Sequence, residues 1–226
     1  MTSPQALETV EIEPAAPADA AILLMHGLGA DGHDFEPVAR EIGLGPAPAV
    51  RWVFPHAPLR SVTINRGFRM RAWYDIASLD GSVEDEEGIA ESARAIHGLV
   101  ERERERGIAA DRVVIAGFSQ GGALALHTAL REPSRLAGVV VLSSYLPLAA
   151  RLDREAHPAN AAVPVFMAHG SHDPVLPFAL GQRSRDFLRA RGYQVDWHEY
   201  PIGHSLSAEE IDALRDWLSR VLPPRS

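Results

Sequence analysis

Ser119 lies at the centre of a Gly-Phe-Ser-Gln-Gly pentapeptide, residues 117–121, whose spacing is typical of a nucleophilic serine. The apolar run 112–116 before it is typical of a buried strand, and residues 122–130 after it of a helix. A turn that passes directly from strand to helix raises the serine hydroxyl above the sheet. Glycines beside the serine make the turn possible because they carry no Cβ. These residues predict covalent catalysis by the Ser119 hydroxyl.

A serine hydroxyl is a weak nucleophile at neutral pH, so it needs a base, and the base needs a carboxylate to orient it. When the nucleophile occupies such a turn, the acid and then the histidine follow it along the chain, each after a strand. Asp173 follows the strand predicted over 163–168, and His204 follows the strand predicted over 194–200. Their order and position predict a catalytic triad of Ser119, Asp173 and His204.

Other acidic residues and histidines of the chain are weaker candidates for the same roles. Asp153 lies in a polar connection and Asp75 lies before a long helix, so neither follows the right strand. His198 lies inside a strand, which holds its imidazole in one face of the sheet. His169 and His172 have a spacing that suits a metal ion, but no further ligands cluster with them in the sequence, so we expect no metal site.

Acyl transfer also requires hydrogen-bond donors for the negative oxygen of the tetrahedral intermediate, the oxyanion hole. One donor is expected to be the backbone N–H of Gln120, directly after the nucleophile. The segment 26–30, His-Gly-Leu-Gly-Ala, follows the strand predicted over 21–25 and fits the position of the second donor. We choose the N–H of Leu28; the alternative is a tight glycine turn without a catalytic part. His26 is expected to be structural.

Strand and helix patterns alternate along nearly the whole chain, which predicts a single α/β domain, residues 1–226, with a mostly parallel central sheet and helices on both faces. Strands are predicted over 8–12, 21–25, 50–55, 112–116, 137–142, 163–168 and 194–200, and helices over 35–42, 84–106, 122–130, 178–191 and 207–222.

Three segments invite a more specific interpretation. Residues 59–83 form the longest stretch without a clear element, which in a compact domain indicates a functional loop, here a substrate-covering one. The Glu-Arg repeat over 101–106 is interpreted as a solvated helix face with i,i+3 charge pairs. Residues 207–210, Ser-Ala-Glu-Glu, are predicted to form a capping box at the start of the last helix.

Composition narrows the functional classes. The 226 residues are 46% apolar, as in ordinary globular proteins, and their net charge of −8 argues against general nucleic-acid binding. The chain has no cysteine, which excludes disulfides and thiol catalysis, and its basic residues are all arginine, which excludes Schiff-base lysines. No secretory signal or membrane-length apolar run is visible, so we expect a cytoplasmic protein without stable membrane insertion. A homodimer is left open.

The chain resembles the carboxylesterase and acyl-protein thioesterase family of α/β hydrolases. The resemblance is carried, in order along the chain, by His26-Gly27-Leu28-Gly29, Phe54-Pro55-His56-Ala57-Pro58, Ala72-Trp73-Tyr74-Asp75-Ile76, Gly117-Phe118-Ser119-Gln120-Gly121-Gly122, His169-Gly170-Ser171-His172-Asp173-Pro174-Val175 and Gly203-His204. It implies an α/β-hydrolase fold, no cofactor, and a serine carboxylesterase that hydrolyses short to medium esters of small molecules through an acyl-serine intermediate. The alternatives are an acyl-protein thioesterase or lysophospholipase as the main activity, another hydrolytic reaction on the same scaffold, or a catalytically silent binding protein.

The resemblance also implies an apolar acyl pocket covered by the segment before Trp73. Its candidate residues are Phe68, Met70, Trp73 and Leu176. The segment departs from the family pattern because it carries three arginines, Arg66, Arg69 and Arg71. One hypothesis places them at the rim of the site, where they tolerate an anionic or polar substrate; the other interpretation is solvated arginines on a mobile loop.

Overall fold

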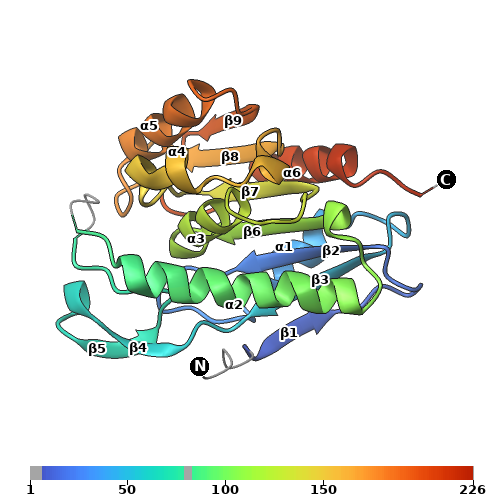
Figure 1. Ribbon diagram of the computed structural model, residues 1–226, viewed down its shortest axis with the longest axis horizontal. Helices are drawn as coiled ribbons and strands as arrows, with labels where there is room; N and C mark the ends of the chain where they lie inside the picture. The colour runs from blue at the N-terminus through green and yellow to red at the C-terminus, as the bar shows by residue number, and fades with distance from the viewer. Residues whose placement is uncertain (1–6, 79–82, 226) are drawn as a thin grey trace.

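A seven-stranded sheet runs through the centre of the molecule (Figure 1), and the computed structural model describes residues 7–78 and 83–225 of the chain. The strands lie in the order β1-β3-β2-β6-β7-β8-β9. They span Thr9–Ile12 (β1), Ala20–Met25 (β2), Val50–Pro55 (β3), Val113–Phe118 (β6), Gly138–Leu142 (β7), Val165–Gly170 (β8) and Val195–Tyr200 (β9). The edge strand β1 is antiparallel to β3, and all other pairs are parallel, which confirms the predicted fold class.

Helices cover both faces of this sheet. They span Glu36–Ile42 (α1), Glu86–Glu105 (α2), Gln120–Ala129 (α3), Leu152–Glu155 (α4), Phe178–Arg189 (α5) and Ala208–Val221 (α6). Side chains of α2, α3, α4 and α5 contribute to one hydrophobic cluster, and side chains of α1 and α6 contribute to a second. Figure 1 shows α2 and α3 lying across the face of the sheet that belongs to the first cluster.

Strand β2 illustrates why the sheet is the middle of three layers. Its alternate residues Ala21, Leu23 and Met25 belong to the cluster under α2 and α3, while Ile22 and Leu24 belong to the cluster under α1 and α6. Successive side chains of a strand point to opposite faces, so a strand buried on both faces must be apolar throughout. This explains why the sequence shows continuous apolar runs.

The predicted functional loop over 59–83 is wrong in one respect, because part of it has regular structure. Strands β4 (Leu59–Val62) and β5 (Phe68–Arg71) form a separate two-stranded antiparallel sheet, joined by a short 3₁₀ turn. Both strands are only four residues long, and Leu59 and Val62 in β4 are not spaced with a period of two, so the hairpin gives a weak sequence signal even though β5 alternates apolar residues with arginines. Residues 79–82 of the stretch lie outside the described residues.

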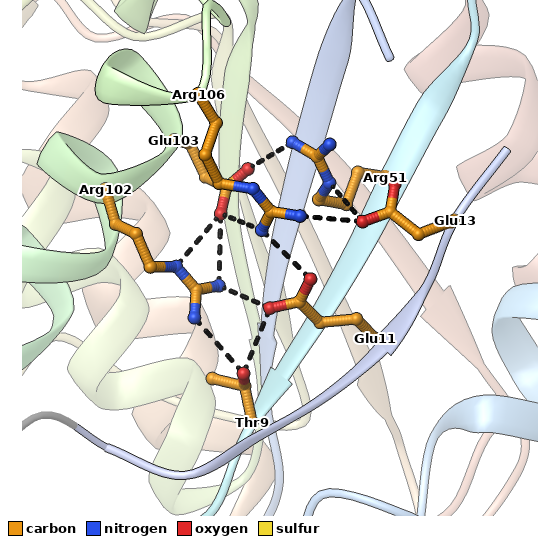
Figure 2. A network of polar contacts seen from close by, with 7 residues as sticks. All are labelled: Thr9, Glu11, Glu13, Arg51, Arg102, Glu103 and Arg106. Carbon is orange, nitrogen blue, oxygen red and sulfur yellow. Dashed lines mark hydrogen bonds and ion pairs between the residues drawn. The ribbon is translucent and has the colours of Figure 1, made fainter. Parts of the chain in front are cut away.

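The interpretation of 101–106 as a solvated face also needs correction. The i,i+3 pairs exist, but Glu103 is fully buried and contacts Arg51 of β3 at 2.8 Å and Arg106 at 3.0 Å. Figure 2 shows how this carboxylate, together with those of Glu11 and Glu13, ties the end of α2 to the edge of the sheet. The sequence could not reveal this, because the partners lie far away along the chain.

Removing the central carboxylate should therefore destabilise the fold. Glu103→Ala leaves Arg51, Arg102 and Arg106 with one partner fewer in a largely buried position. We expect the free energy of unfolding, measured by urea titration, to fall by about 2 kcal/mol or more. The exposed Glu105 ends the same helix, and Glu105→Ala should stay within about 0.5 kcal/mol of the parent. Equal effects of the two substitutions would contradict a structural role for the network.

Helix α6 begins with half of the predicted capping box. The Ser207 hydroxyl accepts a hydrogen bond from the N–H of Glu210 at 3.2 Å. The Glu210 side chain is buried and interacts with the backbone N–H of Ser207 at the helix start, as in a capping box, but neither carboxylate oxygen forms a hydrogen bond of normal geometry among the described residues. Burial raises the pKa of Glu210 from 4.5 to about 7, because the charged form is poorly solvated there.

This raised pKa predicts a specific pH dependence of stability. At a pH of about 4 both the folded and the unfolded chain carry a protonated Glu210, so the group has little effect. Between about pH 4.5 and pH 7 the unfolded state ionises first, so stability falls as the pH rises, by at most about 3 kcal/mol. The free energy of unfolding of Glu210→Met, relative to the parent, should therefore be higher at about pH 8 than at about pH 4. The same substitution at the exposed Glu209 should show no such change with pH. Chemical unfolding at both pH values measures this; a pH-independent difference would refute it.

Candidate active site

Ser119 occupies a single-residue junction between β6 and α3. Its backbone has φ 53° and ψ −120°, a conformation that L-residues rarely adopt. The neighbouring strand β7 holds it in place: the N–H of Ser119 donates to the carbonyl of Leu142 at 2.9 Å, and the hydroxyl of Ser144 donates to the Ser119 carbonyl at 2.6 Å. Such strain persists only where the surroundings enforce it, and it is common at active sites.

The flanking glycines are required by close backbone approach. A Cβ on Gly117 would lie 2.2 Å from the carbonyl carbon of Gly121, and a Cβ on Gly121 would lie 2.4 Å from the carbonyl oxygen of Met25. The start of α3 therefore packs directly against β6 and the end of β2. This explains the Gly-x-Ser-x-Gly pattern mechanically.

Asp173 and His204 meet although 31 residues separate them in sequence. Asp173 follows β8, His204 follows β9, and the Oδ2 of Asp173 lies 2.6 Å from the Nδ1 of His204. The other oxygen, Oδ1, accepts from the N–H groups of Val175 and Leu176, both at 2.8 Å. Because the carboxylate can only accept at this contact, Nδ1 carries the proton and Nε2 is left with its lone pair.

The His204 ring also packs against the end of β6, directly before the nucleophile. Its centroid lies 4.7 Å from that of Phe118, the residue directly before Ser119. The Asp173 side chain is fully buried, whereas His204 keeps 15% of its side chain exposed. The structure thus gathers the three residues of the predicted triad at the carboxyl ends of β6, β8 and β9.

The rival acids lie elsewhere and have their own partners. Asp153 is exposed and forms an ion pair with Arg191 at 2.6 Å. Asp75 accepts hydrogen bonds from the backbone and side chain of Thr63, at 2.7 and 2.5 Å, and so shapes the turn after β4.

The loop after β2 lies against the nucleophile. A Cβ on Gly27 would be in contact with the Ser119 Cβ at 3.4 Å. The N–H groups of Leu28 and Gln120 have no acceptor among the described residues. By contrast, the N–H of Gly29, the residue after Leu28, donates to the carbonyl of Arg71 at 2.9 Å. Two unpaired donors, one directly after the serine and one on the loop that approaches it, are what an oxyanion hole needs.

His26 is buried beneath this loop. Its Nδ1 donates to the carbonyl of Gly27 at 2.7 Å, and its Nε2 accepts from the N–H of Ala57 at 3.1 Å. Burial lowers the pKa of the imidazole to about 4, so the ring is neutral at physiological pH. Both ring nitrogens are occupied by backbone groups, which matches the structural role expected for His26.

The four residues predicted for the acyl pocket differ in exposure and do not line one common cavity. Phe68 is 70% exposed, and Met70 is half-buried with its sulfur 3.8 Å from the position of a Cβ on Gly29. Leu176 is buried on the loop that holds Asp173. Trp73 is completely buried and lines a cavity of about 270 Å³ that the other three do not line. Of the four candidates, Met70 lies beside the glycine loop, and Trp73 forms hydrogen bonds with Gln120 and with His26 at the start of that loop.

The arginines of the hairpin do not converge on the serine. The guanidinium of Arg71 donates to the carbonyl of Ala57 at 2.8 Å, and that of Arg69 donates to Leu59 at 3.3 Å. Arg66 lies at the turn of the hairpin with φ 57°. Strand alternation places Arg69 and Arg71 on the face opposite Met70. The hypothesis that they tolerate an anionic or polar substrate at the rim therefore gains no support from their contacts.

Two supporting residues were missed from sequence. Ser144 holds the Ser119 carbonyl; a buried serine pair directly after an apolar strand was a usable signal. His169 lies inside β8, donates from Nε2 to Leu176 at 3.0 Å and lies 3.5 Å from the Oδ2 of Asp173. Burial lowers the pKa of His169, so the ring is neutral. It is a supporting residue for the loop of the acid.

One group of described residues has the composition of a metal site, namely His97, Glu101 and Glu132. His97 and Glu132 already contact one another at 2.8 Å, and both oxygens of Glu101 are held by Arg104 at 2.7 and 2.8 Å. These partners account for the group without an ion. It lies on α2 and beyond the end of α3, whereas Ser119 lies at the start of α3.

The sheet order and the strained serine define an α/β hydrolase, and comparison with known proteins identifies the family. Residues 7–222 match the model of the phospholipase/carboxylesterase family. Acyl-protein thioesterase 1 of Neurospora crassa is 42% identical over 215 residues, covering 90% of this chain and 87% of that protein. Acyl-protein thioesterase 1 of Cryptococcus neoformans is 35% identical over 237 residues, covering 97% of this chain and 99% of that protein.

The solved structures agree with the sequences. The crystal structure of Zea mays acyl-protein thioesterase 2 superposes with a TM-score of 0.84 at 32% identity, covering 95% of this chain and 99% of that one. The chain therefore belongs to the phospholipase/carboxylesterase family, and it is a hydrolase of the esterase and thioesterase class. Within the described part of the chain, no helix has the length and apolar character needed to cross a membrane.

Proposed function

We propose that this protein hydrolyses thioesters of S-acylated proteins through an acyl-serine intermediate. Ser119 is the nucleophile, His204 the general base and Asp173 the residue that orients the base. The observation that carries the proposal is the 2.6 Å contact between His204 Nδ1 and Asp173 Oδ2, because it leaves Nε2 as the acceptor on a ring packed against Phe118, directly before the strained serine.

The first half of the reaction forms the acyl-enzyme. His204 Nε2 takes the proton of the Ser119 hydroxyl as its oxygen attacks the thioester carbonyl. The N–H groups of Leu28 and Gln120 bind the oxyanion, each contributing about 3 kcal/mol in comparable enzymes. When the intermediate collapses, the carbon–sulfur bond breaks, and the thiol takes the proton from His204.

The second half releases the acid. Water attacks the acyl-serine, His204 accepts a proton from that water, and the same two N–H groups bind the second oxyanion. Collapse returns the proton to Ser119 and frees the carboxylic acid. Asp173 stays ionised throughout: it holds the productive tautomer of His204 and stabilises the imidazolium that forms twice per cycle.

The choice of a protein thioester rests on the relatives, several of which are named acyl-protein thioesterases. The half-buried Met70 beside the oxyanion loop and the exposed Phe68 supply apolar surface for an acyl chain. The second candidate is an oxygen ester of a small molecule, the main expectation from the sequence, which the description of the family supports.

Loss of the nucleophile should abolish turnover without unfolding the protein. We expect Ser119→Ala to lower kcat by about 10⁴-fold or more, since the base and oxyanion donors cannot replace a covalent step. Hydrolysis of a p-nitrophenyl ester measures this, with circular dichroism as the control for folding. A fluorophosphonate should label the parent at Ser119. Retained turnover in Ser119→Ala would overturn the mechanism, and a parent that neither turns over nor reacts would indicate a silent binding protein.

The substrate class is tested with matched acyl donors. One peptide carries an acyl group on cysteine, and an otherwise identical peptide carries it on serine; lysophosphatidylcholine with the same acyl group is the third substrate. We expect kcat/KM for the thioester to exceed that for the oxygen esters by about tenfold or more, a difference of about 1.4 kcal/mol in transition-state stabilisation. Ser119→Ala measures the background. Equal or higher values for either oxygen ester would favour carboxylesterase or lysophospholipase activity instead.

A further inference from the structure

Trp73 uses both of its N–H groups to contact the two sides of the candidate oxyanion hole. Its indole Nε1 donates to the carbonyl of His26 at 2.9 Å, and its backbone N–H donates to the side-chain Oε1 of Gln120 at 2.9 Å. His26 begins the loop that carries Leu28, and Gln120 is the residue after the nucleophile. One completely buried residue therefore connects the two segments that present the unpaired N–H groups.

The side chain of Gln120 completes this connection. Its Nε2 donates to the carbonyl of Tyr74 at 2.7 Å, while its Oε1 accepts from Trp73. The orientation of the buried amide is thus determined, since one neighbour can only donate and the other only accept. The carbonyl of Trp73 in turn accepts a hydrogen bond from the hydroxyl of Ser92 on α2.

The oxyanion loop needs such external support. It contains Gly27 and Gly29, and Gly29 has φ 80°, so its own backbone restricts it little. The donors work only if both lie within hydrogen-bond distance of the developing oxyanion, and a displacement of about 1 Å can cost on the order of 100-fold in rate. The loop is also held by the bond from the Gly29 N–H to the carbonyl of Arg71, two residues before Trp73, and by the His26 ring on the Gly27 carbonyl.

We propose that Trp73 is a positioning residue that fixes the separation between the Leu28 and Gln120 donors, an inference that rests on the serine hydrolase function proposed above. The segment 71–74 holds the glycine loop on one side and the amide of Gln120 on the other. Strand β5 runs directly into this segment. The hairpin that carries Met70 is therefore joined rigidly to the oxyanion hole.

The test is Trp73→Phe, which keeps an aromatic ring and the backbone N–H but removes the indole donor and leaves the His26 carbonyl unpaired. We expect kcat for a p-nitrophenyl ester to fall about tenfold with KM changed less than about twofold, because the donors act mainly in the transition state. The matched control is Trp52→Phe. Trp52 is also buried, stacked on Phe54 in the core on the other face of the sheet.

The comparison separates positioning from simple packing. Both variants lose a buried indole, so both should lower the thermal midpoint, but only Trp73→Phe should lower kcat. The proposal is overturned if Trp52→Phe lowers kcat as much, or if the effect of Trp73→Phe falls on KM. A second variant, Gln120→Met, keeps the backbone donor and removes both side-chain hydrogen bonds. If Trp73→Phe does not fold, Gln120→Met tests the same proposal, and its kcat should fall in the same way.

Combining the two substitutions provides a further criterion. If Trp73 and Gln120 act through one connection, the double variant should lose less activity than the product of the two single losses. Fully multiplicative losses would contradict a shared role. Failure of this inference is distinguishable from failure of the proposed function, because the latter requires that the parent itself lacks turnover or fluorophosphonate reaction at Ser119.

Discussion

The whole site depends on the close contact between the start of α3 and the ends of β2 and β6. The backbone at Gly121 approaches the Met25 carbonyl so closely that a Cβ would lie 2.4 Å from it, and Gly117 faces the same helix turn. With the helix start pressed so near, Ser119 must make the whole turn by itself at φ 53°. Its hydrogen bond to Leu142 on the neighbouring strand helps to maintain that conformation.

The parallel sheet then brings the other groups to the same edge. In the order β2-β6-β7-β8-β9 every strand runs in one direction, so residues that follow each strand emerge side by side. The oxyanion loop follows β2, Ser119 follows β6, Asp173 follows β8 and His204 follows β9. Groups spread over most of the sequence therefore meet without any long excursion of the chain.

This regularity explains what could be predicted. Asp173 follows the buried, apolar strand β8 and stands out by contrast with it. His204 follows the half-buried edge strand β9, and its place after Ser119 and Asp173 along the chain allowed it to be selected from sequence. The hairpin within 59–83 could not be predicted, because its strands have only four residues each and the apolar residues of β4 do not alternate. The burial of Glu103 depends on its contact with Arg51 of β3, and the burial of Glu210 depends on how α6 packs; neither leaves a local pattern.

Three buried carboxylates illustrate how the surroundings decide what a charge contributes. Glu103 is surrounded by guanidinium groups and joins α2 to the sheet edge. Neither oxygen of Glu210 forms a hydrogen bond of normal geometry among the described residues, and burial raises its pKa to about 7. Asp173 lies between these cases: two backbone N–H groups satisfy one oxygen, which leaves the other free to hold His204. An arginine in that place would neutralise the acid and weaken its hold on an imidazolium, whereas uncharged backbone donors orient the carboxylate and leave its charge available to the histidine.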